Sequence, residues 1–293
     1  MKRKESRTSQ RAGNSIPRVV VHVPHAAVAI PEKWRDKILL DEESLRRELI
    51  RMTDWYTDDL FGMEPMQGSA VTGEAAKLRY VRAPYSRLAC DMERFRDPAQ
   101  EGMTAKGMWI CYEKTADGLP LKEADAAHIE DVLAVYDRHH ASLTKACEDA
   151  LRAGGGKADG RMLLIDAHSF PSVPLPYELA DGTPGAAEER PDFCLGTDPV
   201  HTPPALAEAA KRFLEARGYT VAFNTPFAGV LVPMAYYRKE PRVQALMIEV
   251  NRSLYIDERT AEKLPDEPDG RRGYRRTKHV AQALLEELRA CAE

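Results

Sequence analysis

A run of four apolar residues that ends in an acid, a histidine and a serine constrains the fold of this chain most strongly. Met162-Leu-Leu-Ile is followed at once by Asp166, Ala167, His168 and Ser169. A continuous apolar run of this length is typical of a strand that is buried on both faces of an α/β sheet. Open α/β sheets bind their ligands along the edge where such strands end. The polar residues after the run are therefore predicted to lie at a functional site.

Two other stretches have the same form. Val19-Val-Val-His22-Val-Pro-His25 ends in a histidine, and Ala245-Leu-Met-Ile-Glu249 ends in a glutamate. Strand patterns alternate with helical ones along the chain, and the clearest helix spans Ala126 to Arg152. Such alternation predicts an α/β fold, a three-layer sandwich around a central mixed sheet.

The remaining elements are predicted from apolar periodicity and capping residues. A helix opens at Asp41, and Thr53 is the predicted N-cap of a short helix over Asp54–Phe61. Residues 97–122 lack periodicity and are predicted to form a surface segment or lid. Further strands are expected at Arg18–Val23, Leu78–Arg82, Phe193–Gly196, Tyr219–Phe223 and Gln244–Val250, and further helices at Pro203–Arg217 and from Thr277.

Composition limits the class of protein. Residues 1–16 are predicted to be a disordered basic tail, and 17–293 a single catalytic domain. The net charge of −4 and the lack of a long apolar run give no support for a nucleic-acid or membrane partner. Five scattered cysteines and no secretory signal favour a cytoplasmic protein with reduced thiols. The oligomeric state is left open.

Two strand-end histidines, His25 and His168, are candidate metal ligands. A catalytic zinc takes three protein ligands and a water, so a third ligand is required. Asp54 is the preferred third ligand, and Asp58 and Asp166 are the alternatives. The competing interpretation is that each histidine is a hydrogen-bonded structural residue. Mn or Co would suit the same ligands.

A strand-end glutamate, Glu249, is the candidate general base, because a carboxylate beside a metal-bound water can move its proton. The alternative is a structural salt bridge to Arg252 or Arg87. Arginines near the motifs, which also include Arg94, could bind a substrate carboxylate through two parallel hydrogen bonds. An acidic small-molecule substrate is therefore expected.

Three further histidines are assigned other roles. His22 is predicted to be a core residue or to support a ligand, since it lies on the strand before His25. His128 and His139 are predicted to face solvent from the long helix.

The ordered set of motifs resembles the N-formylglutamate amidohydrolase family over about Val19 to Asp257. The matching pieces are Val23-Pro24-His25, Thr53-Asp54-Trp55, Tyr85-Ser86-Arg87 with Asp91, Asp166-Ala-His168-Ser169, Leu195-Gly196-Thr197, Asn224-Thr-Pro-Phe227-Ala-Gly229, Tyr237 and Ile248-Glu249-Val-Asn251-Arg252-Ser-Leu-Tyr255. The resemblance implies a phosphorylase/hydrolase-like fold, similar to that of zinc carboxypeptidases. It implies a zinc on His25, Asp54 and His168, with Glu249 as general base and acid. Substrate binding is expected from Tyr85, Arg87, Arg94, Asn251 and Arg252.

The sequence departs from the family pattern at two motifs. The usual His-Ser-Gly is His25-Ala26-Ala27, and the common Asp-Leu-Asn-Arg is Asp91-Met92-Glu93-Arg94, which adds a negative charge at Glu93. The predicted activity is removal of a formyl or short acyl group from an N-acylated amino acid, most of all N-formyl-L-glutamate. The alternatives are hydrolysis of another N-acyl amino acid or small amide, and a non-catalytic homologue that only binds a ligand.

Overall fold

A six-stranded mixed sheet forms the centre of the computed structural model, which describes residues 18–63, 78–153, 160–179, 189–268 and 270–292. The strand order is β2-β1-β3-β6-β4-β5, and every neighbouring pair is parallel except β4 and β6. The predicted mixed α/β sheet is confirmed. The strands are β1 (Val19–Val23), β2 (Leu78–Arg82), β3 (Met162–Phe170), β4 (Phe193–Gly196), β5 (Val221–Phe223) and β6 (Val243–Asn251).

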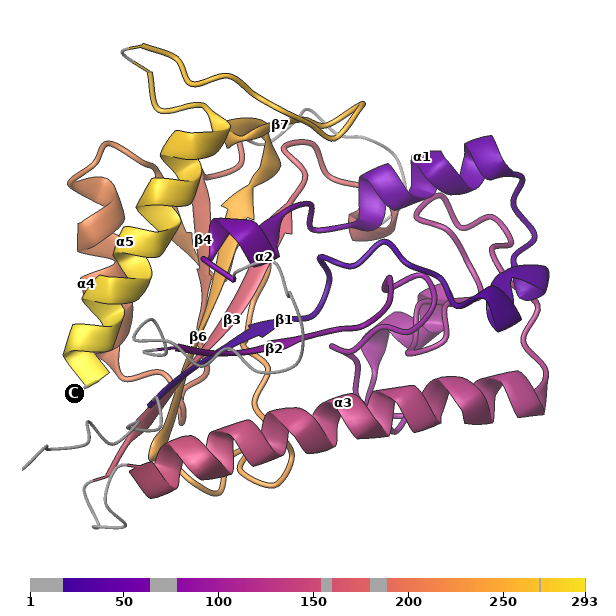
Figure 1. Ribbon diagram of the computed structural model, residues 1–293, viewed down its shortest axis with the longest axis horizontal. Coiled ribbons are helices and arrows are strands. Elements are labelled where there is room, and N and C mark those ends of the chain that lie inside the picture. The colour runs from indigo at the N-terminus through magenta and orange to yellow at the C-terminus, as the bar shows by residue number, and fades with distance from the viewer. Residues whose placement is uncertain (1–17, 64–77, 154–159, 180–188, 269, 293) are drawn as a thin grey trace, which may run out of the picture.

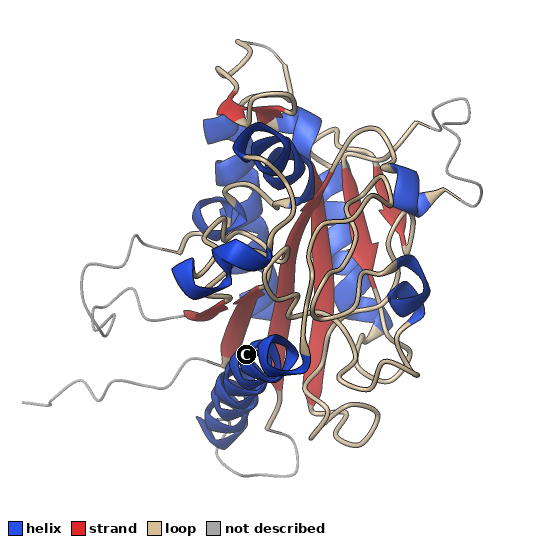
Figure 2. Cartoon of the chain, turned by 90° about the vertical axis from the view of Figure 1, so that its right-hand side faces the viewer, coloured by secondary structure: helices blue, strands red, loops and turns tan. Residues whose placement is uncertain are grey.

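Helices cover both faces of this sheet (Figures 1 and 2). The long helix α3 (Ala126–Ala153) runs along one face, and α2 (Thr57–Leu60), α4 (Pro204–Glu215) and α5 (Tyr274–Ala292) lie on the other. Helix α1 (Glu42–Met52) lies beyond the end of β1 (Figure 1). The smaller elements are η1 (Glu32–Lys37), η2 (Gly102–Lys106), η3 (Pro176–Glu178), η4 (Arg252–Leu254), β7 (Ile256–Asp257) and β8 (Glu262–Lys263).

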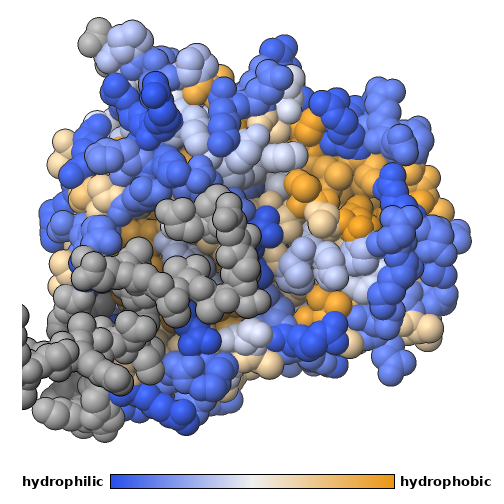
Figure 3. Space-filling model, viewed as in Figure 1, coloured by the Kyte–Doolittle hydropathy of each residue, from blue (hydrophilic) through white to orange (hydrophobic). Residues whose placement is uncertain are grey.

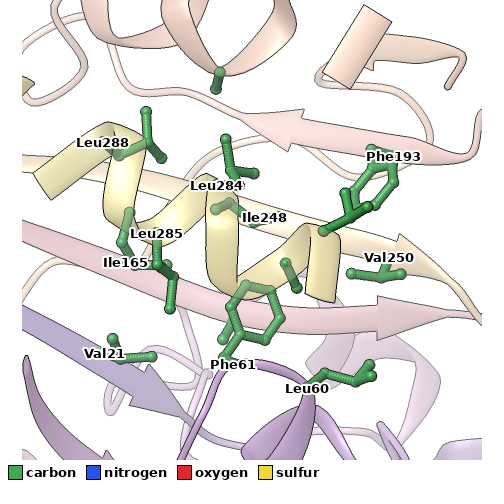
Figure 4. Close-up of a cluster of buried hydrophobic side chains, with 14 of the residues drawn as sticks. Val21, Leu60, Phe61, Ile165, Phe193, Ile248, Val250, Leu284, Leu285 and Leu288 are labelled. Carbon is green, nitrogen blue, oxygen red and sulfur yellow. The ribbon is translucent and has the colours of Figure 1, made fainter. Parts of the chain in front are cut away.

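Alternate residues of the central strands supply two separate cores. Val21, Ile165 and Ile248 pack towards α2 and α5, as Figure 4 shows. Their sequence neighbours Val20 and Leu164 pack with Leu143 and Cys147 of α3. Because both faces are covered, β3 and β6 are buried along their whole length, which explains the unbroken apolar runs Met162–Ile165 and Ala245–Ile248 within them.

The short helix after α1 is smaller than predicted. Asp41 caps α1 as expected, since its side chain accepts a hydrogen bond from the Ser44 amide at 2.7 Å. Thr53, however, ends α1 rather than starting a helix, and α2 begins only at Thr57. Tyr56 has a φ of 62°, a left-handed conformation that no helix can include. The predicted cap at Thr53 is therefore wrong.

The segment over 97–122 is only in part the surface segment or lid that the sequence predicts: residues 97–106 are mostly exposed, but much of the remainder is buried. It contains η2, but Met108, Ile110, Tyr112 and Leu121 are fully or almost fully buried. These side chains pack against α1 and the first half of α3 without a repeating backbone pattern, so they leave no periodic signal in the sequence. The predicted tail, residues 1–16, lies outside the described residues.

The outer surface gives two further facts. Within the described ranges, none of the helices has the length and apolar character needed to cross a bilayer. Figure 3 shows a largely hydrophilic face, with hydrophobic residues gathered around the position of α1.

Four cysteines, Cys90, Cys111, Cys147 and Cys194, are free and buried.

Candidate metal centre and active site

Strand register brings the polar residues of the three central strands together. His22 of β1 pairs with Asp166 of β3, and His168 of β3 pairs with Glu249 of β6. Register partners on neighbouring strands point to the same face, and so do residues two apart on one strand. These four side chains therefore lie on the α3 face of the sheet. His25, just beyond the end of β1, joins them at the edge that the sequence predicts.

Two buried imidazoles form the centre of the site. The rings of His25 and His168 lie 5.1 Å apart between centroids, and each residue is at most 2% exposed. His168 Nδ1 donates to Asp54 Oδ2 at 3.0 Å, and the same oxygen lies 3.7 Å from His25 Nδ1. Burial alone would favour the neutral acid, but the hydrogen bond from His168 and the nearby His25 and Arg252 hold the pKa of Asp54 well below its usual range.

A second carboxylate, Asp91, orients the other imidazole. His25 Nε2 donates to Asp91 Oδ1 at 2.9 Å, and Asp91 is fully buried. Its other oxygen accepts from Arg87 Nη2 at 3.0 Å and from the Tyr112 hydroxyl at 2.5 Å, and Arg94 Nη2 lies 3.3 Å away. Two arginines that the sequence assigned to the substrate thus hold the partner of a predicted ligand.

Glu93 faces both imidazoles, and the sequence prediction missed this role. Its carboxylate lies 3.8 Å from His25 Nδ1 and 3.1 Å from His168 Nε2. One ligand atom from each of His25, Glu93 and His168 lies within 4.8 Å of the others, so this group could hold a metal ion. The signal was in the sequence: a charged residue replaces the family's asparagine two positions after Asp91.

The residues present fit a metal ion. His25 Nδ1 and His168 Nε2 are buried nitrogens with no hydrogen-bond partner among the described residues. Imidazole nitrogen and carboxylate oxygen are ligands that zinc accepts, and a ligand histidine normally donates its other N–H to a carboxylate, as His25 does to Asp91 and His168 to Asp54. Asp54 contacts both imidazoles, and its role as a ligand stays a prediction.

Glu249 is a buried carboxyl with an unused oxygen. It is 7% exposed, and its Oε2 has no hydrogen-bond partner in the described part of the chain. Burial raises its pKa to about 8, with Asp54 and Glu93 adding to the shift and His168 opposing it. Arg252, proposed as a salt-bridge partner, instead donates to Asp54 at 2.9 Å.

A cavity of about 650 Å³ opens onto these groups. His25, Asp54, His168 and Glu249 line it, as do the predicted substrate residues Arg87, Arg94 and Arg252. Tyr85 and Asn251 are not among the lining residues. Tyr85 packs edge-on against Trp34, and the Asn251 amide donates to the Pro191 carbonyl at 3.1 Å.

A buried histidine pair lies behind the site. His22 Nδ1 donates to Asp166 Oδ1 at 2.8 Å, and its Nε2 lies 2.8 Å from His139 Nε2. His22 is therefore a buried supporting residue, as predicted. His128 and His139 are buried as well, so their predicted exposure is wrong. His139 faces His22 of β1, and the His128 ring packs edge-on against Trp34, so both histidines lie on packed sides of α3.

The comparisons with known proteins place this architecture in a class of hydrolases. The family model described as N-formylglutamate amidohydrolase matches residues 17–256. Because the match spans most of the sequence, the chain belongs to the N-formylglutamate amidohydrolase family.

Two solved structures have a similar fold. The first is an N-formylglutamate amidohydrolase from Ralstonia eutropha JMP134, with a TM-score of 0.73 and 22% identity over 95% of this chain and 96% of that one. The second is a gene product of Agrobacterium tumefaciens, with a TM-score of 0.57 and 17% identity over 95% of this chain and 91% of that one. A search of the curated proteins finds no match.

Proposed function

We propose that this protein is a metal-dependent amidohydrolase that removes a formyl or short acyl group from an N-acylated amino acid. The observation that carries the proposal is the unpaired Glu249 carboxyl beside the open nitrogens of His25 and His168. Zinc is the preferred ion, and N-formyl-L-glutamate, the substrate predicted from the sequence, is the reference compound. The fold relationship to zinc carboxypeptidases, the single domain over 17–293 and a cytoplasmic location belong to the same proposal.

The metal-binding residues in this proposal are His25, His168 and Glu93, with Asp54 as the alternative carboxylate. A divalent cation bound there would polarise the acyl carbonyl and acidify a water molecule. Asp91 would keep His25 in the orientation that leaves Nδ1 open. Arg252, hydrogen-bonded to Asp54 and Ser169, would fix the carboxylate beside His168.

Glu249 is the proposed proton carrier. It would take a proton from the attacking water and return it to the leaving amine as the C–N bond breaks, so that formate or another short acid and a free amino acid are released. A carboxyl with a pKa raised towards neutral pH is suited to both steps. Register with His168 keeps Glu249 next to the open nitrogens.

The test is formate release by zinc-loaded protein from N-formyl-L-glutamate and N-formyl-L-leucine. Glu249→Gln keeps the shape of the side chain and should lower kcat by roughly 10²–10⁴-fold. Its control is Glu258→Gln, which changes a glutamate that binds the Ser172 amide and does not line the cavity. Full activity in Glu249→Gln, or no hydrolysis of these two compounds and of other N-acyl amino acids, would overturn the proposal.

A further inference from the structure

Each arginine that lines the cavity forms an ion pair with a carboxylate of the protein. Arg252 is the clearest case, since its Nε donates to Ser169 Oγ at 3.2 Å and its Nη2 to Asp54 Oδ1 at 2.9 Å. Its side chain is only 4% exposed. Releasing it to a substrate would leave the buried Asp54 charge without its partner, which is costly. The five cavity arginines are Arg51, Arg87, Arg94, Arg96 and Arg252.

Two arginines further from the imidazoles are paired in the same way. Arg51 makes two hydrogen bonds to Asp117, at 2.5 and 2.8 Å. Arg96 makes two to Asp137, at 2.7 and 3.0 Å. Each of these pairs uses the two-bond geometry that a substrate carboxylate would need.

Arg87 and Arg94 differ because they share one carboxylate. Asp91 is the only acid with which either forms an ion pair in the described ranges. Glu93 beside Arg94 and Asp54 beside Arg87 add further negative charge, so the charge balance leaves these arginines no large positive excess for a substrate. Arg87 uses Nε and Nη2 for Asp91, and its Nη1 makes no hydrogen bond to a described residue, so Nη1 can donate to a ligand oxygen. The arrangement suits one substrate carboxylate, and Glu93, which also lines the cavity, would repel a second.

Part of the cavity lining, called here the apolar wall, is formed by apolar side chains. Phe170 and Phe227 meet edge to face with centroids 6.1 Å apart, and Met234 keeps 54% of its surface exposed. A volume of about 650 Å³ lies within the range of roughly 300–1,000 Å³ that holds drug-sized ligands. N-formyl-L-glutamate is smaller than such ligands and has no large apolar part. The apolar wall consists mainly of Phe170, Phe227, Leu231, Val232, Met234 and Met247.

From this charge balance and apolar wall we infer that the preferred substrate is an N-acyl amino acid with a single carboxylate and an apolar body. This inference rests on the proposed amide hydrolysis and specifies its substrate class. The substrate carboxylate binds Arg87, and the apolar body lies against Phe227 and Met234. A second carboxylate, as in N-formyl-L-glutamate, would lose its hydration at this wall, where Arg190, over the Phe170 and Phe227 rings, is already paired with Glu178.

The test compares kcat/KM of the zinc-loaded protein on three compounds. N-formyl-L-leucine carries its apolar part on the amino acid, N-hexanoylglycine carries it on the acyl group, and N-formyl-L-glutamate carries a second carboxylate. We expect one of the two apolar compounds to exceed N-formyl-L-glutamate by about tenfold or more. A kcat/KM for N-formyl-L-glutamate that equals or exceeds both would overturn the inference and leave the hydrolase proposal intact.

A binding measurement tests the substrate class without depending on hydrolysis. Calorimetric titration of zinc-loaded Glu249→Gln should give an apolar compound a Kd about tenfold or more below that of N-formyl-L-glutamate. The difference in affinity is expected even if none of the compounds is hydrolysed. A lack of hydrolysis would reject the proposed function but not the substrate class. Equal affinities, or tighter binding of N-formyl-L-glutamate, would refute the substrate class.

A matched pair of variants tests the apolar wall itself. Met234→Arg places a guanidinium at the wall, so it should lower the preference for the apolar compound by about tenfold. Leu119→Arg adds the same charge at a residue that is 59% exposed and does not line the cavity, and it should leave the preference unchanged. An unchanged preference in Met234→Arg would contradict the assignment of this wall.

Discussion

The buried ion pair between Arg252 and Asp54 gives the most quantitative prediction. Asp54→Asn keeps the shape of the side chain but removes its charge, while the side chain of Arg252 stays 4% exposed. Breaking a buried ion pair by neutralising one partner costs about 3–5 kcal/mol, because the remaining charge is uncompensated. His168 Nδ1 also loses a charged acceptor, so we expect a loss near the upper end of that range.

An exposed pair with similar geometry supplies the control. Arg96 makes two hydrogen bonds to Asp137, and the two side chains are 57% and 49% exposed. Since water screens this pair, Asp137→Asn should cost at most about 1 kcal/mol.

The assay is urea unfolding at pH 7 in the presence of a chelator, so that metal binding does not contribute to stability. The unfolding free energy of each variant is compared with that of the wild type at equal m-values. If Asp54→Asn costs no more than Asp137→Asn, the described network does not stabilise the protein and the reasoning fails.

Three further predictions concern other parts of the molecule. His139 is neutral when folded because burial lowers its pKa to about 2, whereas the unfolded histidine titrates near 6.5, so stability is lost as the pH falls below about 6.5. From pH 7 to 5 the wild type should lose about 2 kcal/mol more unfolding free energy than His139→Gln, and equal losses would refute this. Gly196→Ala should lower the free energy of unfolding by about 1–3 kcal/mol, because its Cβ would lie 2.1 Å from the Gly229 carbonyl oxygen. In the control Gly102→Ala the new Cβ meets nothing within 4 Å, so the change should stay within about 0.5 kcal/mol. Similar unfolding midpoints for the two variants would show that the backbone does not approach Gly196 this closely. Glu93→Gln should raise the zinc Kd by more than about tenfold in a chelator competition, and an unchanged Kd would remove Glu93 from the site.

The sequence predicted the parts of this structure that depend on local patterns. Continuous apolar runs located β3 and β6, and their polar ends located the edge that holds His168 and Glu249. The long helix was recognised from its period, with an end one residue from that observed. These features follow from backbone geometry and burial, which the order of apolar residues records directly.

The supporting residues could not be predicted in the same way. Asp91 and Glu93 lie in a segment without periodicity, and only the folded chain shows that both meet His25. The arginines were assigned to a substrate because sequence cannot show that Arg252 already has an internal partner. The sequence predicts that His139 faces solvent, because it cannot show that this side of α3 packs against His22 of β1.

The location of a bound ion tests the central claim most directly. Anomalous diffraction from zinc-loaded crystals should show one ion between His25 and His168. It should lie about 2.0–2.2 Å from one nitrogen of each imidazole and from a carboxylate oxygen of Glu93 or Asp54. An ion bound elsewhere, or no ion between these two histidines at saturating zinc, would contradict the account.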